Sequence, residues 1–399
     1  MTTIKRFYLH KFDLRYGINP HQNSAAIFTQ GIDNLPFTII NGQPSYINIL
    51  DATNAWQLVK ELDEAIKLPA ATSFKHVSPT GAAISIDLDE TLLHVYDCKD
   101  LDLSPIATAY VRARGTDPSS SYGDFIGISR NVDLSTANII KKSVSDGIIA
   151  PGFDEKALKI LKEKKGGKYI ILKVNPDYNP PEIEFREVNG IVFSQSRNSL
   201  KITKESILDK VVTKNSYFTE EACRDLLVAT ISLKYTQSNS VAFALNGQTI
   251  GIGAGQQNRL DCIKLASKKS KNWFLRQHPK ILNLPFRKQV GNVDRTNARN
   301  LCIEEELSSS ETRILQSLFT DSFSIISKEE KKEWINKLSN VSLSSDAFFP
   351  FRDNIDHLSK IGVKYIVQPG GSNRDDEVIS ATNEYGIAMS FSGIRLFHH

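Results

Sequence analysis

The chain has 399 residues, of which 40% are hydrophobic and 24% charged, and its formal net charge is +4. Its length predicts two or three folded units, and its composition excludes a disordered protein. The small charge argues against a nucleic-acid-binding protein, and no apolar run reaches the roughly 18 residues of a membrane span. The four cysteines lack C-x-x-C and zinc-finger spacing. We therefore expect a cytoplasmic protein with reduced thiols that binds anionic small molecules and neither nucleic acid nor membranes.

A loop with ligand-binding residue types is predicted at residues 14–22. Gly17 and Pro20 disfavour a regular element there. Arg15 and Tyr16 in this loop are suited to hold an anion or a carboxamide. Simple surface packing is the alternative explanation for both side chains.

A Lys-His pair follows a predicted strand, residues 68–74. That strand follows a predicted helix at 49–66, whose apolar stripe includes Ala52. Lys75 and His76 lie next to one another, so in a straight strand their side chains would point to opposite faces. They can share a cleft only where the backbone bends, and Pro79 and Gly81 are predicted to break the strand there. Histidine can accept a proton near neutral pH, and an ammonium group can stabilise developing negative charge. The alternative is an ordinary surface dipeptide.

Two further positions in the first half are candidates for ligand contact. Gly123 ends a loop of small residues whose backbone can approach a ligand closely. Asp146 precedes a buried apolar run, where it could also cap a neighbouring element. A flexible surface loop is the alternative explanation for the segment around Gly123.

An internal duplication is suggested by two similar stretches. Asp146 is followed by a predicted helix at 154–164 and a Lys-Tyr-Ile strand, and Asp346 is followed by a helix at 354–360 and a second Lys-Tyr-Ile strand. This pattern predicts two similar α/β subdomains, although so short a match can arise by chance.

The second half begins with a predicted amphipathic helix at 220–233 and a polar run that contains Asn239. The dipeptide Asn246-Gly247 between two apolar runs predicts a type I′ hairpin. The glycine-rich stretch that follows fails the dinucleotide-binding pattern, because Asn258 stands where its third glycine should be. We expect a close backbone approach to a flat ligand or a tight helix entry there.

The last third is predicted to hold a mostly helical insertion and then a ligand-binding stretch. Residues 277–340 are dominated by charged and helix-forming residues, with a capping box that starts at Ser327. Three phenylalanines follow around Pro350, beside Asp353, and together they would suit an aromatic ring with an exocyclic amide or amine. Core packing is the more common role of such phenylalanines.

Six stretches together resemble the transformylase part of the bifunctional AICAR formyltransferase/IMP cyclohydrolase family, where AICAR is 5-aminoimidazole-4-carboxamide ribonucleotide. They are Arg-Tyr-Gly-Ile-Asn-Pro-His-Gln (15–22), Phe-Lys-His-Val-Ser-Pro-Thr-Gly-Ala-Ala (74–83), Ser-Asp-Gly-Ile-Ile-Ala-Pro (145–151), Lys-Tyr-Thr-Gln-Ser-Asn-Ser (234–240), Ile-Gly-Ala-Gly-Gln-Gln (252–257) and Asp-Ala-Phe-Phe-Pro-Phe (346–351). The resemblance extends from about residue 14 to the end of the chain, with the motifs in the same order.

The resemblance implies an α/β fold of two cytidine-deaminase-like, three-layer α/β/α subdomains with a helical insertion. The first subdomain is expected at 1–180, and the second at 181–276 and 341–399, with the insertion at 277–340 between its two parts. The resemblance also implies a homodimer with active sites at the subunit interface. The implied reaction moves a formyl group from the co-substrate 10-formyltetrahydrofolate to AICAR, without a catalytic metal.

The resemblance also assigns residues to roles. The catalytic residues are His76 as proton acceptor, Lys75 as transition-state stabiliser and Asn239 as the holder of the carboxamide. The residues expected to bind AICAR are Arg15, Tyr16, His76, Gly123, Asp146, Asn239 and Arg395, the last as a phosphate ligand. The residues expected on the folate side are Arg259, Leu260, Phe348, Asp353, Ser372 and Asn373.

Two departures from the family pattern limit these expectations. The stretch that resembles the family starts just before Arg15, so no cyclohydrolase domain and no inosine monophosphate ring closure are expected from this chain. Ser119, Tyr122 and Leu260 differ from the vertebrate-like pattern on the folate side. A non-catalytic nucleotide- or folate-binding partner of a separate cyclohydrolase is the alternative function. A zinc deaminase is a third hypothesis, although the chain lacks the H-x-E and P-C-x-x-C signature.

Overall fold

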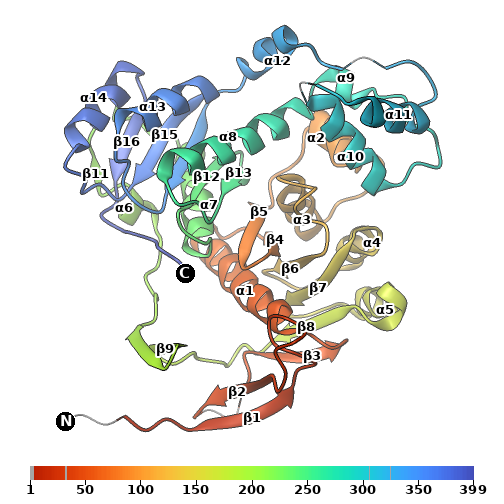
Figure 1. The fold of residues 1–399 in the computed structure, drawn as a ribbon, viewed down its shortest axis with the longest axis vertical. Coiled ribbons are helices and arrows are strands. Elements are labelled where there is room, and N and C mark those ends of the chain that lie inside the picture. Colours follow the sequence, from red (N-terminus) through yellow and green to blue (C-terminus); the bar gives the residue numbers. More distant parts are fainter. Residues whose placement is uncertain (1–3, 32–33, 305, 324) are drawn as a thin grey trace.

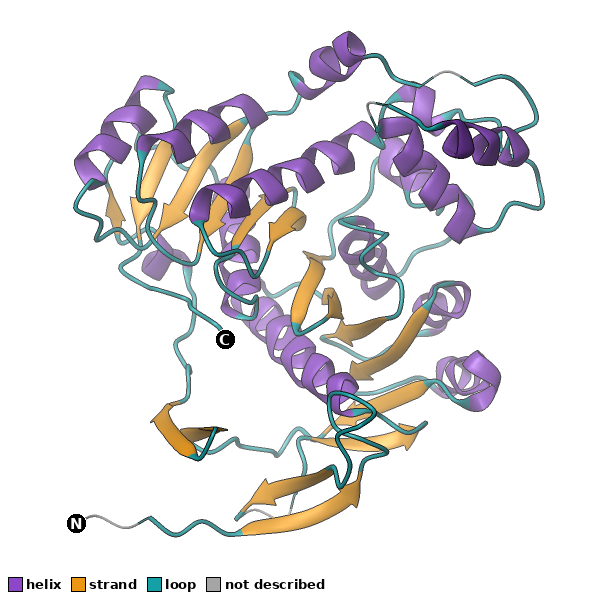
Figure 2. Ribbon diagram, in the orientation of Figure 1, coloured by secondary structure: helices purple, strands orange, loops and turns teal. Residues whose placement is uncertain are grey.

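A computed structural model describes residues 4–31, 34–304, 306–323 and 325–399. The fold is mixed α/β, with helices on both faces of one large sheet (Figures 1 and 2). The described strands of this sheet run in the order β11-β16-β15-β14-β12-β13-β5-β4-β6-β7-β8-β3. The expected three-layer α/β/α class is thus confirmed, with both halves of the chain joined in one continuous sheet.

The elements fall into two halves and three additions. The first half holds β3 (Phe37–Asn41), α1 (Tyr46–Ile66), β4 (Ala70–Lys75), β5 (Ser78–Ile84), α2 (Glu90–Val95), α3 (Pro105–Gly115), β6 (Asp124–Ile128), α4 (Leu134–Lys142), β7 (Ser145–Ala150), α5 (Glu155–Glu163) and β8 (Ile170–Val174). The second half holds α6 (Lys204–Ile207), β11 (Lys210–Val211), α7 (Glu220–Lys234), β12 (Val241–Leu245), β13 (Gln248–Gly253), α8 (Arg259–Leu275), β14 (Val341–Ser345), α13 (Arg352–Leu358), β15 (Val363–Gln368), α14 (Asp375–Glu384) and β16 (Ala388–Phe391). The additions are the ribbon of β1 (Tyr8–Asp13) and β2 (Ala26–Gln30), the ribbon of β9 (Ile183–Val188) and β10 (Ile191–Ser196), and the helices α9 (Pro279–Leu282), α10 (Asn292–Ile303), α11 (Ser309–Leu318) and α12 (Lys328–Ile335).

The two halves repeat one topology. From the centre of the sheet outward, β5-β4-β6-β7-β8-β3 in the first half matches β13-β12-β14-β15-β16-β11 in the second. In each half a long helix precedes a hairpin, and these helices, α1 and α7, pack against one another on one face of the sheet. The remaining large helices cover the other face. The duplication expected from the sequence is therefore present in the fold.

The residue-level match that suggested this duplication is shifted by one strand-helix unit. Topology pairs β8 with β16 and β7 with β15, whereas the two Lys-Tyr-Ile stretches belong to β8 and β15. Asp146 lies at the start of β7, and Asp346 follows the end of β14. Short similar stretches recur because parallel strand-helix units share one hydrophobic pattern, so the pattern could not identify the equivalent units.

The helices of residues 279–335 occupy a defined place in this topology. They lie between α8 and β14, where the first half has only the loop of residues 116–123 between α3 and β6. The predicted capping box at Ser327 is confirmed, with the Glu330 backbone N–H donating to the serine hydroxyl at 3.2 Å. We propose that the subdomain boundaries lie near 180, 276 and 340, because these positions fit this arrangement.

Local predictions for the two long helices and the second hairpin are also confirmed. α1 begins three residues earlier than predicted, because Ser45 forms a capping box with Asn48. Asn246 and Gly247 have φ values of 49° and 73°, as a type I′ turn requires. The glycines that follow allow close packing of β13 on α8, since a Cβ at Gly253 would lie 2.4 Å from the carbonyl oxygen of Cys262.

Candidate active site

The Lys-His pair lies at a hairpin turn. β4 ends at Lys75, β5 begins at Ser78, and His76 and Val77 form the two-residue turn between them with φ values of 52° and 56°. Positive φ at both central residues is the type I′ signature, which normally uses Asn-Gly because other residues lose about 1–2 kcal/mol each in this region. A β-branched valine there is a strong outlier. The predicted backbone break is thus confirmed, and it exposes His76.

The cause of that break differs from the prediction. Pro79 and Gly81 do not interrupt the strand, because both lie within β5. Pro79 pairs with Phe74 and Gly81 pairs with Ser73, which leaves Thr80 as the extra residue of a bulge. Bulges tolerate proline, and glycine is required at 81 because a Cβ would lie 2.2 Å from a carbonyl oxygen of α3. These two residues therefore shape β5, and the turn alone reverses the chain.

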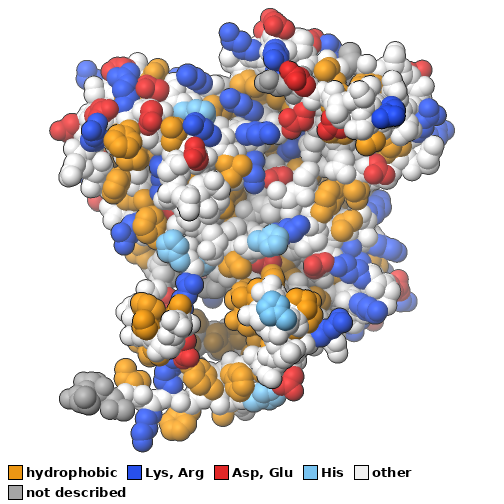
Figure 3. Space-filling view, viewed as in Figure 1, with side chains coloured by type: hydrophobic (Ala, Val, Ile, Leu, Met, Phe, Trp, Pro, Cys, Tyr) orange, Lys and Arg blue, Asp and Glu red, His pale blue; other side chains and the backbone are white. Residues whose placement is uncertain are grey.

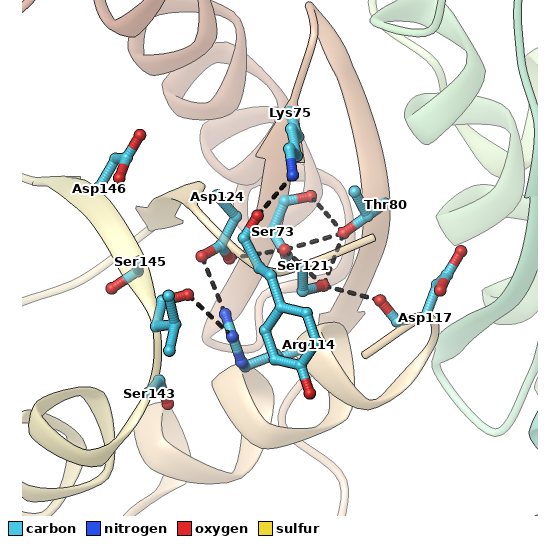
Figure 4. A network of polar contacts seen from close by, with 12 residues as sticks. Ser73, Lys75, Thr80, Arg114, Asp117, Ser121, Asp124, Ser143, Ser145 and Asp146 are labelled. Atoms are coloured by element: carbon cyan, nitrogen blue, oxygen red, sulfur yellow. Dashed lines mark hydrogen bonds and ion pairs between the residues drawn. The ribbon is translucent and has the colours of Figure 1, made fainter. Parts of the chain in front are cut away.

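The ammonium group of Lys75 is held by the loop before β6. Its Nζ donates a hydrogen bond of 2.5 Å to the backbone carbonyl of Tyr122 (Figure 4). Beneath this contact, Ser73 donates to Asp124 at 2.6 Å, and the Ser73 and Ser121 hydroxyls lie 2.8 Å apart. This buried network ties the end of β4 to the loop that carries Gly123.

Asp124 anchors that network. Its side chain is fully buried and forms an ion pair of 2.8 Å with Arg114. Burial raises the pKa of the Asp124 carboxyl, which Arg114 opposes. Arg114 also donates to the carbonyl of Val144, just before β7 (Figure 4). One arginine thereby joins the starts of two parallel strands.

Gly123 and Asp146 lie beside one another. Gly123 has a φ of 72°, and a Cβ there would lie 3.9 Å from Asp146 Oδ1. The same Asp146 oxygen forms a half-exposed ion pair of 2.5 Å with Lys165. Lys75, His76, Gly123 and Asp146, hereafter the first cluster, therefore lie together at one edge of the sheet.

Asn239 is fixed by internal hydrogen bonds. Its Oδ1 accepts from Arg259 Nη2 at 2.7 Å, and its Nδ2 donates to the carbonyl of Gln256 at 2.9 Å. Arg259 is buried, and its Nη1 lies 2.5 Å from Asp346 Oδ1 and 2.8 Å from the carbonyl of Ser240. The guanidinium predicted to contact folate is thus bonded within the protein, whereas its neighbour in the chain, Leu260, is half-buried.

The C-terminal residues return to this loop. Ser238 donates from its backbone N–H to the carbonyl of His398 at 3.0 Å, and His398 N–H donates to the Ser238 hydroxyl at 3.1 Å. Leu396 N–H donates to the carbonyl of Asp346. Arg395 is exposed in this segment, with its guanidinium carbon 4.7 Å from the centroid of the Phe397 ring. The structure therefore brings Arg395 toward the Asn239 loop.

The remaining folate-side candidates follow two parallel neighbours, β14 and β15. Phe348 is 42% exposed, whereas Phe349 is fully buried and donates its N–H to Gln368. The three phenylalanines of this stretch thus divide between the core and the surface. Asp353 and Asn373 are exposed and Ser372 is half-buried. These residues and Asn239, Arg259, Leu260 and Arg395 form the second cluster.

Both clusters lie at the same edge of the sheet, because the two halves join antiparallel through β5 and β13. They are nevertheless far apart within one chain. Asp146 on β7 and Ser372 after β15 are separated by seven strand spacings, which is roughly 34 Å at about 4.8 Å each. Sheet twist shortens this distance only in part. One small ligand cannot contact the outer members of both clusters in a single chain.

A cavity of about 480 Å³ lies at the Lys75–His76 turn. Gln237, Ala254 and Gly255 also line it, and the Gln237 N–H donates to the Ser78 hydroxyl at 3.1 Å. The turn thus faces the loop before β12 and the loop after β13. Arg15 and Tyr16 do not line this cavity; Arg15 is exposed and lies over the Tyr16 ring at 5.9 Å.

One carboxylate at the site was missed by the sequence analysis. Asp51 Oδ1, on α1, accepts a hydrogen bond of 2.7 Å from the backbone N–H of Val77. Its residue is only 5% exposed, and desolvation raises the pKa of the Asp51 carboxyl to about 6. The available signal was an acidic residue beside Ala52 on the apolar stripe of a predicted helix.

Comparison with known proteins places this chain in a family. The family model described as "AICARFT/IMPCHase bienzyme" matches residues 2–269. The chain belongs to this family. The AICARFT/IMPCHase match includes the first cluster, Asn239 and Arg259.

A curated relative extends the similarity beyond the residues that the family model matches. The bifunctional purine biosynthesis protein PurH of Persephonella marina (strain DSM 14350 / EX-H1) is 32% identical over 394 residues. The alignment covers 98% of this chain and 59% of the relative, so this chain spans about three fifths of the length of that PurH protein.

In the part of the chain that the structure describes, no helix combines the length and apolar character needed to cross a membrane. Within the same residues, no group of three or more His, Cys, Asp and Glu side chains could hold a metal ion.

Proposed function

We propose that this chain transfers the formyl group of 10-formyltetrahydrofolate to the 5-amino group of AICAR, giving formyl-AICAR and tetrahydrofolate in de novo purine (IMP) biosynthesis. One observation carries the proposal. In a chain of the AICARFT/IMPCHase family, an exposed His76 on a strained turn borders a cavity beside the Lys75 ammonium group. Strained backbone that persists is typical of functional sites.

The chemistry needs a base. The 5-amino nitrogen is a poor nucleophile because its lone pair is delocalised into the imidazole ring, so it must be oriented and deprotonated as it attacks the formyl carbon. His76 takes that proton, directly or through the substrate carboxamide. The new C–N bond forms first and gives a tetrahedral intermediate. The bond between the formyl carbon and folate N10 then breaks, and N10 leaves with a proton.

Two further groups assist this transfer. Lys75 stabilises the oxyanion of the tetrahedral intermediate or protonates the leaving nitrogen. It is held near the turn by the carbonyl of Tyr122. Asn239 holds the carboxamide of AICAR, and its orientation is supported by Arg259 and Gln256.

The binding roles follow the two clusters. We propose that Arg15, Tyr16, Gly123, Asp146 and Arg395 bind AICAR together with His76 and Asn239, with Arg395 on its phosphate. We propose that Leu260, Phe348, Asp353, Ser372 and Asn373 form the folate side. Arg259 would act on that side indirectly, by holding Asn239 and Asp346 in place, because its guanidinium already bonds both side chains.

A homodimer would bring the clusters together. The outer members of the first and second clusters of one chain are too far apart for one nucleotide, but a twofold partner can place its second cluster against the first. Large hydrophobic side chains are exposed on the ribbons β1–β2 and β9–β10, where they gather on the lower part of the face in Figure 3. They include Tyr8, Leu9, Phe28, Ile183, Val188, Ile191, Val192 and Phe193. Two-stranded ribbons are marginally stable alone, so a covering partner is favoured.

Tetrahydrofolate release tests the reaction. The purified protein is mixed with AICAR and 10-formyltetrahydrofolate, and release of tetrahydrofolate is followed by its absorbance. Turnover is the expected result. A protein that binds AICAR but releases no tetrahydrofolate overturns the proposal and favours the alternative, a non-catalytic partner of a separate cyclohydrolase, which would co-purify with cyclohydrolase activity.

Complementation tests the shared site. His76→Ala and Asn239→Ala proteins, each inactive, are mixed, dissociated and reassociated. If each active site combines the first cluster of one chain with the second cluster of its partner, half of the dimers are hybrids with one intact site, and activity returns to about a quarter of the wild-type value. Sites contained within single chains would give no recovery.

A further inference from the structure

The two halves of the chain contain the same anchored turn. In the first half, Asp51 stands six positions after the α1 N-cap Ser45 and accepts from Val77 N–H at 2.7 Å. In the second half, Asp225 stands six positions after the α7 N-cap Thr219. It accepts from the N–H groups of both residues of the Asn246–Gly247 turn, at 2.7 and 2.6 Å. A buried carboxylate on the long helix thus anchors the tip of each hairpin.

The two anchored turns differ in how well their own residues tolerate positive φ. Asn246 and Gly247 adopt the left-handed region readily, so the type I′ turn of the second half is favoured by its own sequence. His76 and Val77 do not, and both nevertheless have positive φ. The turn of the first half therefore depends on contacts from outside, and Asp51 supplies one at its second residue.

The surroundings of the two carboxylates also differ. Asp225 has an adjacent cation, with Arg224 Nη2 3.1 Å from its Oδ1. Burial is the main cause that raises the pKa of both carboxyls. Arg224 opposes this rise at Asp225, whereas the nearby acids Asp124 and Asp146 raise the pKa of Asp51 further. The Asp51 carboxylate therefore lies where its charge is disfavoured, under a turn whose own residues disfavour the conformation of that turn.

The geometry links this anchor to the reacting group. Positive φ at His76 directs its side chain away from the pleat of β4, so that Lys75 and His76 need not point to opposite faces. A turn that relaxed to negative φ would move the imidazole away from the cavity. We propose that Asp51 is a positioning residue, which holds His76 in its reacting orientation by anchoring the backbone of the His76–Val77 turn. This proposal rests on the proposed formyl transfer.

The test compares the two anchors. Asp51→Ala, Asp51→Asn and the matched control Asp225→Asn are purified, their folded fractions are measured by circular dichroism, and kcat, KM and the dissociation constant for AICAR are determined. We expect Asp51→Ala to lower kcat about 100-fold, as a misplacement of about 1 Å can, with AICAR affinity changed less than about 3-fold. Asp225→Asn should keep the wild-type kcat per folded molecule.

A rescue variant separates positioning from folding. Glycine adopts positive φ without strain, so Val77→Gly should restore about 10-fold of the lost kcat in the Asp51→Ala background. If Asp51→Ala does not fold, Asp51→Asn with and without Val77→Gly gives the same comparison. An unchanged kcat in the Asp51 variants, or an equal loss in Asp225→Asn, overturns the proposal.

The wild-type protein distinguishes failure of the proposed function from failure of the proposed anchor. If the wild type releases no tetrahydrofolate, the proposed function fails. The anchor is then tested by crystal structures of the wild type and Asp51→Ala, which lacks the side-chain acceptor. A His76–Val77 turn that moves supports the anchor, and a turn that is identical in both structures overturns it.

Discussion

Arg259 and Asp346 form a buried ion pair, with Nη1 2.5 Å from Oδ1, and the same guanidinium donates to the side-chain oxygen of Asn239 at 2.7 Å. Asp346 also accepts from the hydroxyl of Ser238 and the N–H of Ser240. The orientation of the proposed carboxamide holder therefore depends on a charge pair from two distant segments of the chain.

Removal of Arg259 from this buried ion pair should destabilise the folded protein. Arg259→Ala leaves the Asp346 carboxylate buried without its ion-pair partner, which typically lowers the free energy of unfolding by about 3–5 kcal/mol. Urea unfolding measures this change. Arg352→Ala removes a surface ion pair with Glu384 and should leave the urea midpoint nearly unchanged. Equal effects of the two substitutions would contradict a structural role for the buried pair.

The proposed role of His76 as the base is tested directly by His76→Ala. Because His76 is exposed on a turn, its truncation should leave the fold intact. We expect loss of detectable turnover, with AICAR binding by calorimetry largely retained. Turnover close to the wild-type rate would remove His76 from the mechanism.

Adding a glycine to the first turn and removing one from the second should change the free energy of unfolding in opposite directions. Val77→Gly should raise the free energy of unfolding by up to about 1 kcal/mol, since relief of left-handed strain exceeds the entropic cost of glycine. Gly247→Ala should lower it by about 1–2 kcal/mol, because Gly247 has a φ of 73° and a Cβ would lie 2.4 Å from Ile86 Cδ1. Thermal or urea unfolding distinguishes these outcomes, and destabilisation by both would show that the His-Val turn is not strained.

The raised pKa of Asp51 predicts a pH dependence of stability. The folded protein binds the Asp51 proton more tightly than the unfolded chain does. The contribution of this carboxyl to the free energy of unfolding therefore falls by about 3 kcal/mol as the pH rises from about 4 to about 6. The charged groups nearby are Asp124, paired with Arg114, and Asp146, paired with Lys165. The difference between wild type and Asp51→Asn, measured by urea unfolding at pH 4 to 7, isolates this contribution. A difference that is constant with pH would show that the Asp51 pKa is not raised.

Patterns within the sequence determined much of the local structure. Helical periodicity predicted α1 and α7, and Asn246-Gly247 predicted the second hairpin, because these signals depend on residues close in the chain. Lys75 and His76 are adjacent in the sequence, so their side chains could share one cleft only where the backbone bends. That bend exists, although the proline and glycine credited with it shape β5 instead.

Only the tertiary structure decided where these pieces act. The antiparallel junction of β5 and β13 places both clusters at one edge of the sheet, and no local pattern encodes that register. The hydrogen bond from the helix to the His76–Val77 turn comes from Asp51, which lies 26 residues from Val77 in the sequence. Its burial and its raised pKa depend on the packing of α1 against the sheet. A hydrogen bond between a helix and a distant turn leaves no periodic signature, so the fold alone revealed it.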